Sequence, residues 1–62
     1  MKIKWTNKWS GEVGFVKIIH AKDRYFENTF DEAEAKVFAK NTVKKALAQL
    51  DDFCPDNVYE AV

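Results

Sequence analysis

The strongest constraint on this chain is an amphipathic helix near its C-terminal end. Apolar residues recur at helical spacing over about residues 41–53, and polar residues fill the positions between them. Asn41 is the predicted N-cap. Pro55 ends the helix, because Cys54 precedes a proline and is therefore disfavoured in the α region. The apolar stripe consists of Val43, Ala46, Leu47, Leu50 and Phe53.

The first part of the chain has the period of β-strands. Ile3 and Trp5 alternate with polar residues, as in a half-buried strand. Residues 13–20 are apolar on both faces, which predicts a central strand of the sheet. Gly14 within this strand indicates a bulge or the close approach of another group. The connection before it contains Gly11, which is free to take a positive φ.

Residues 24–29 are expected to return as the hairpin partner of the central strand, with Phe26 on the core face. A short last strand is predicted over residues 57–62. Two capping boxes at 29–32 and 31–34 predict a helical turn at about residues 31–34. Residues 36–39 are left open between helix and strand. The alternative is one helix over residues 31–52, which Asn41 and Thr42 disfavour as poor helix-interior residues.

These elements predict a single small α+β domain over residues 1–62. A small antiparallel sheet of three to four strands packs against one main helix, and Val16 or Phe15 meets Leu47 and Leu50 in the core. A domain of 62 residues buries only about 60% of the surface of its unfolded chain. One cysteine excludes an internal disulfide. No apolar run approaches the roughly 18 residues of a membrane span, and no signal-peptide core follows Met1, so a cytoplasmic protein is expected.

Charge is balanced in total and uneven along the chain. Residues 1–24 carry six basic residues against two acidic ones, whereas residues 25–62 carry four against eight. This asymmetry is typical of a protein with one basic face, or of two halves that attract each other within the fold. We favour attraction within the fold, because a dedicated nucleic-acid binder usually has a clear basic excess.

The chain offers little for catalysis. His20, Cys54 and Ser10 are the single residues of their types, and their spacing gives no nucleophile with an orienting base. The acidic cluster at residues 51–57 lacks the alternating acids and mid-loop glycine of an EF-hand, and is interpreted as a solvated turn. No phosphate-binding loop or zinc spacing occurs. We therefore predict no enzyme, no metal and no cofactor.

Two tryptophans lie among lysines near the N-terminus. Trp beside Lys can stack on bases while the cations bind phosphates, and Trp is also enriched at protein–protein hot spots. The structural alternative is that both indoles cover the small core. We expect the Trp9 region to be a contact surface for a protein, which includes another copy of this chain. The predicted interaction surface consists of Trp9, Lys8, Trp5, Lys4 and Lys17.

The order of these segments carries a family resemblance. Gly14-Phe-Val-Lys17 leads to Tyr25-Phe26, an acidic turn and Ala35-Lys-Val-Phe38, and then to the capped Ala-rich helix and a final Val-Tyr-Glu-Ala-Val. This layout resembles small proteins encoded by phages and prophages of Gram-positive bacteria, most of them uncharacterised. The resemblance implies a phage-type accessory protein that acts in a bacterial cytoplasm.

Strands followed by a phenylalanine, a cap and an Ala-rich helix are also similar to the arm-site DNA-binding domain of tyrosine-type integrases. That family binds DNA with a sheet rich in Arg and Lys. This chain has one Arg, and its central strand offers Lys17 alone. We therefore predict a small non-enzymatic binding module that acts by protein–protein interaction, with a nucleic-acid-binding sheet as the alternative.

Overall fold

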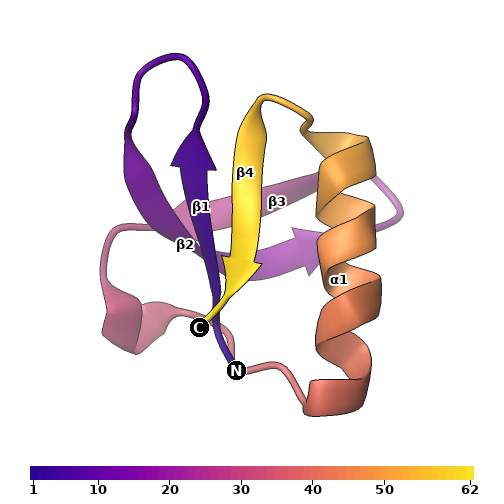
Figure 1. The fold of residues 1–62 in the computed structure, drawn as a ribbon. Helices are drawn as coiled ribbons and strands as arrows, with labels where there is room; N and C mark the ends of the chain where they lie inside the picture. Colours follow the sequence, from indigo (N-terminus) through magenta and orange to yellow (C-terminus); the bar gives the residue numbers. More distant parts are fainter.

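A four-stranded antiparallel sheet and one helix make up the fold (Figure 1). The structure is a computed structural model that describes residues 1–62. The strand order is β3-β2-β1-β4, which confirms the α+β class and the central place of the strand over residues 13–20. The elements along the chain are β1 (Ile3–Asn7), β2 (Val13–His20), β3 (Tyr25–Thr29), the 3-10 turn η1 (Glu32–Glu34), α1 (Lys40–Phe53) and β4 (Asn57–Ala61).

The sheet bends because β2 changes partners along its length. β1 pairs only with the first part of β2, where Trp5 lies opposite Gly14, and β3 pairs with β2 from Phe15 onward. The register shifts at Lys17, so the bulge lies there and not at Gly14. Figure 1 shows β2 curving from the direction of β1 towards that of β3. A bulge in the middle of a long strand produces such a bend.

Gly14 allows the indole of Trp5 to pack directly on the backbone of β2. A Cβ atom at position 14 would lie 2.5 Å from Trp5 Cζ2, closer than side-chain carbons approach. The expectation of a close approach at this glycine is therefore confirmed. The register places Trp5 over the one residue in β2 that has no side chain.

The core lies between the helix and the concave side of the sheet. Val16 and Leu50 are fully buried, as predicted, whereas Leu47 and Phe26 are partly buried at the margin. Leu47 lies on the flank of the apolar stripe of α1, so only part of its side chain is covered by the core. The seven core residues are Ile3, Trp5, Val16, Phe38, Val43, Ala46 and Leu50.

The segment before the helix is neither helix nor strand. Its amides form isolated hydrogen bonds: Lys36 N donates to Val16 O, and Phe38 N donates to Met1 O. The predicted turn at residues 31–34 is confirmed as η1, with Asp31 Oδ1 accepting from the amide of Ala33. A single helix over residues 31–52 is excluded, because the chain is extended at Ala35.

The predicted N-cap of the helix is wrong by two residues. Helix α1 begins at Lys40, its N-cap is Ala39, and no side chain caps it. Asn41 lies within the first turn instead. The bond between Phe38 and Met1 anchors the chain just before the helix, and Ala39 O accepts from the amides of Thr42 and Val43. The tertiary contact therefore sets the helix start.

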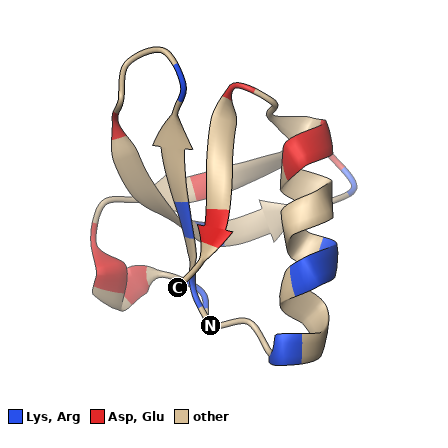
Figure 2. Ribbon diagram, in the orientation of Figure 1, with Lys and Arg blue, Asp and Glu red and all other residues tan.

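Opposite charges join the two halves of the chain (Figure 2). Lys4 Nζ lies 3.7 Å from Glu60, and Arg24 lies 2.9 Å from Asp52. Each pair links a basic residue before position 25 to an acidic residue after it. Neither helix has the length and apolar character needed to cross a membrane.

Candidate interaction surface

The loop between β1 and β2 is organised by one side chain, that of Asn7. Asn7 Oδ1 accepts from the amides of Trp9 at 3.0 Å and Ser10 at 2.9 Å. The carbonyl of Asn7 accepts from the amide of Gly11, which takes the expected positive φ of 74°. Ser10 Oγ accepts from the amide of Glu12. Asn side chains that bond the following amides stabilise a turn locally, so this loop has a defined backbone.

The base of the loop is bonded to the start of β4. Lys8 N donates to Asp56 O at 2.9 Å, and Asn7 Nδ2 donates to Asn57 Oδ1 at 3.2 Å. Asn57 Nδ2 in turn donates to the hydroxyl of Tyr59, which donates to Cys54 O at 2.9 Å. This series of hydrogen bonds holds the loop against the turn that follows α1.

Tyr59 is the one group with a strongly shifted pKa. Burial of its ring raises the pKa to about 12, because the phenolate would lose hydration. Donation from Asn57 acts in the opposite direction, and the neighbouring Cys54 adds to the rise. The hydroxyl therefore stays protonated at neutral pH and remains a donor to the Cys54 carbonyl.

Trp9 projects from this organised loop into solvent. Its exposed fraction is 82%, the largest among the exposed large apolar residues of the protein. The amide of Trp9 is held by Asn7, whereas its indole has no stacking partner in the structure. The alternative that both indoles cover the core is therefore wrong for Trp9, and a protein contact at Trp9 stays a prediction.

Two exposed valines lie at the same end of the sheet. Val13 and Val58 both pair with Thr6, so the three residues form one row across the sheet. Trp5 next to Thr6 points into the core, and side chains alternate along a strand, so this row lies on the outer face. The exposed fractions are 42% for Val13 and 55% for Val58. We use "the Trp9 surface" for Trp9, Val13 and Val58.

The structure divides the five residues of the predicted surface. Lys8 and Trp9 lie together in the loop. Lys4 lies on the outer face in the ion pair with Glu60, and Lys17 is exposed at the bulge of β2. Trp5 is only 6% exposed and belongs to the core, so its place on the predicted surface is wrong. The register that sets Trp5 over Gly14 accounts for this burial.

Sequence reasoning missed Val13 and Val58 as surface residues. Residues 13–20 are apolar on both faces and residues 57–62 form a short predicted strand, and neither pattern says which side of the strand faces the core. Their pairing with Thr6, the polar neighbour of Trp5, places them on the outer face, and only the structure gives this register.

The remaining reactive side chains have ordinary partners. His20 lies 2.6 Å from Glu27 and stacks on the ring of Tyr25 on the outer face of the sheet. Asp52 of the acidic cluster is paired with Arg24. No group of three or more His, Cys, Asp and Glu side chains is placed to hold a metal ion.

No protein-family model, curated protein or solved structure matches this chain.

Proposed function

We propose that this protein is a non-enzymatic binding module that attaches to another protein through the Trp9 surface. The observation that carries the proposal is an indole 82% exposed on a loop whose backbone is already hydrogen-bonded. A small domain gains stability by burying its aromatic residues. Leaving Trp9 outside forgoes that gain, and a partner that covers the indole recovers it.

The organised loop lowers the entropic cost of binding. Ordering a flexible loop on association reduces affinity, whereas a preformed loop has already been ordered by folding. The bonds from Asn7 and the bond from Lys8 to Asp56 supply that order here. Trp is also the residue type in which hot-spot energy concentrates, with losses of at least about 2 kcal/mol on truncation to Ala.

The charges around the Trp9 surface favour a protein over a nucleic acid. Lys8 and Glu12 lie in the same loop and Asp56 is bonded to it, so both signs are present. Lys4, the nearest basic residue on β1, is already paired with Glu60. Protein interfaces surround an apolar centre with a mixed polar rim, whereas nucleic-acid affinity depends on neutralising many phosphates with free cations.

The test compares two exposed apolar side chains. Trp9→Ala and Val37→Ala each remove one, from the loop and from the segment before α1, where Val37 is 70% exposed. Both variants should retain the wild-type circular dichroism spectrum. Proteins captured from a bacterial lysate by the wild type are purified, and their binding to the wild type, to Val37→Ala and to Trp9→Ala is measured directly. The expected loss for Trp9→Ala is about thirtyfold in Kd.

Sedimentation of the protein alone, over a concentration series, shows whether the partner is a second copy. A concentration-dependent dimer that Trp9→Ala abolishes supports the same surface. The proposal is wrong if the chain stays monomeric and every directly measured partner binds Trp9→Ala as tightly as wild type. Sub-micromolar DNA binding that weakens with salt and is lost on Lys4, Lys8 and Lys17→Glu would replace the proposal with the nucleic-acid alternative.

A phage-type role in a bacterial cytoplasm stays a prediction.

A further inference from the structure

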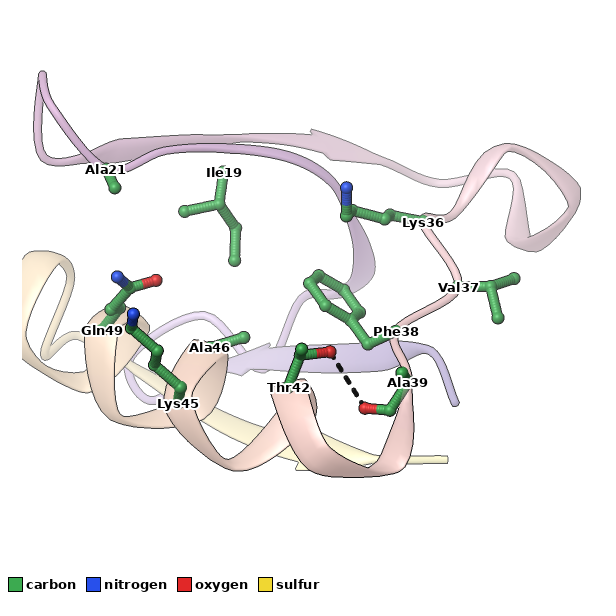
Figure 3. A pocket seen from close by; sticks show the side chains of 10 residues that line it. All are labelled: Ile19, Ala21, Lys36, Val37, Phe38, Ala39, Thr42, Lys45, Ala46 and Gln49. Carbon is green, nitrogen blue, oxygen red and sulfur yellow. Dashed lines mark hydrogen bonds between the residues drawn. The ribbon is translucent and has the colours of Figure 1, made fainter.

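A groove separates the first turns of α1 from the end of β2. Its volume is about 490 Å³, and ten residues line it. Figure 3 shows Ile19, Phe38 and Ala46 directed into it from β2, from the segment before the helix and from α1. Phe38 and Ala46 belong to the core and Ile19 packs against it, so the floor of the groove is the edge of the core itself.

Cations alone supply the charge of this groove. Lys36 and Lys45 line it from different sides, and no Asp or Glu is among its ten residues (Figure 3). The ammonium of Lys36 lies 5.7 Å from the centroid of the Phe38 ring, beside the apolar floor. The acidic residues of α1, Asp51 and Asp52, lie near the opposite end of the helix. The groove is therefore positively charged although the chain has no net charge.

We propose that this groove binds a small organic carboxylate with an apolar body. The apolar body would cover Ile19 and Phe38, and the carboxylate would bind the ammonium of Lys36 or Lys45, with the side-chain amide of Gln49 as a further donor. The hydroxyl of Thr42 already donates to Ala39 O. The volume lies within the range of about 300–1,000 Å³ that is usual for small-molecule sites. The only charged groups among the ten lining residues are two ammonium groups beside an apolar floor, which matches a ligand with one carboxylate and an apolar body.

The groove and the Trp9 surface have no residue in common. The carboxylate site is therefore independent of the proposed function, and variants of one leave the other intact. Trp9→Ala should bind the carboxylate as the wild type does.

Octanoate is the probe, because it joins one carboxylate to a short alkyl chain. In an NMR titration of the full chain, octanoate should shift the resonances of Ile19, Phe38 and Ala46 in a saturable way. Acetate keeps the charge without the apolar body, and octyltrimethylammonium keeps the alkyl chain with the opposite charge. Both should leave these resonances unchanged at the same concentrations.

Two pairs of lysines provide a matched comparison. Lys36→Gln with Lys45→Gln removes both cations from the lining, whereas Lys40→Gln with Lys44→Gln removes two nearby cations that do not line the groove. Exposed ion pairs each contribute up to about fivefold in affinity. We therefore expect about a tenfold loss for the first pair and less than twofold for the second.

Three results would overturn the proposal. The first is equal binding of octanoate and octyltrimethylammonium, which would make the groove a non-selective apolar patch. The second is an equal loss of affinity in the two double variants, which would reduce the effect to net charge. The third is the absence of octanoate shifts together with binding of an acidic peptide in the groove, which would make it a protein-binding site. All variants are first checked by thermal melting, so that loss of fold is not read as loss of binding.

Discussion

The two tryptophans of the β1–β2 hairpin lie four residues apart and have opposite environments. Trp5 is 6% exposed and packs on Gly14, whereas Trp9 is 82% exposed at the tip of the loop. The strand register decides the first environment, since it provides a neighbour without a side chain. The exposure of Trp9 follows from Asn7. Its side chain accepts hydrogen bonds from the loop amides, so the loop is held in place without packing of the indole. Aromatic content alone therefore says little about core size in a chain this short.

The comparison also separates, within one hairpin, the residues that stabilise the fold from those of the proposed binding surface. Residues that pack at Trp5 hold the fold together, and residues around Trp9 are organised by polar bonds that leave an apolar side chain free. Substitutions in the strand should change folding, and substitutions of the Trp9 indole should change binding alone.

Trp5→Ala should produce the largest effect. Truncation of a buried aromatic residue costs about 3–5 kcal/mol, and a domain of this size has a total stability of about 3–9 kcal/mol. The variant should be largely unfolded in a thermal or urea melt. Trp9→Ala is the control and should change the free energy of unfolding by less than about 0.5 kcal/mol. Equal losses in the two variants would contradict the contrast between the two environments.

Gly14→Ala should be the next most damaging change. The added methyl group would lie 2.5 Å from Trp5 Cζ2, and a buried ring has little room to move, so we expect a loss of about 1–3 kcal/mol. Trp5→Leu with Gly14→Ala should lose less than the sum of the two single changes, because the smaller side chain frees the space. Urea denaturation of the four proteins in this cycle measures the coupling. An additive result would mean that Trp5 does not limit position 14.

Asn7→Ala should loosen the loop at a cost of about 1–2 kcal/mol, because the amides of Trp9 and Ser10 and the side chain of Asn57 lose their partner. Hydrogen exchange of these two amides should accelerate. Asn7→Asp is the matched control, since it keeps the acceptor oxygen and loses only the donor to Asn57. Slow exchange of both amides in Asn7→Ala would show that the loop does not depend on this side chain.

Tyr59 should make stability depend on pH in the alkaline range. Its pKa is raised from 10.0 to about 12 in the folded protein, so the unfolded chain releases this proton first as pH rises. The contribution of Tyr59 to stability is complete below pH 10 and is lost between pH 10 and pH 12. Tyr59→Phe should be slightly less stable than wild type at neutral pH, because the bond to Cys54 O is lost.

The melting temperature of Tyr59→Phe should then fall less steeply than that of wild type above pH 10. The two proteins differ only in the hydroxyl of residue 59, so the comparison isolates the tyrosine. Parallel pH profiles would place the Tyr59 hydroxyl in contact with bulk water.

Sequence patterns were sufficient for the local elements of this fold. The apolar alternation of β2, the hairpin with β3 and the stripe on α1 all depend on neighbours within a few residues, and their predicted ranges agree with the structure. Pro55 indicated the end of α1 by a local effect as well, because a proline disfavours the α region for the residue directly before it. The glycine within β2 also signalled a close approach before its partner could be named.

Features that depend on distant residues could not be predicted in the same way. The start of α1 is set by the bond between Phe38 and Met1, which local propensity does not contain. The burial of Trp5 depends on the register with Gly14, and the exposure of Val13 and Val58 depends on which parity of each strand faces the helix. Tertiary pairing determines these environments, so Trp9 is the one residue of the Trp9 surface that the sequence predicted.

The pairing of β1 with β4 also sets the order in which the protein can fold. Ile3 lies opposite Ala61, so this ladder joins two strands that are far apart in the sequence. The two hairpins and the helix use contacts near in sequence. Closing a long loop is entropically costly and slows folding. During synthesis, one edge of β1 therefore stays unpaired until residues 57–61 have left the ribosome. We expect the complete sheet to form only after residues 57–61 have been synthesised, with the β1–β4 ladder as its last step.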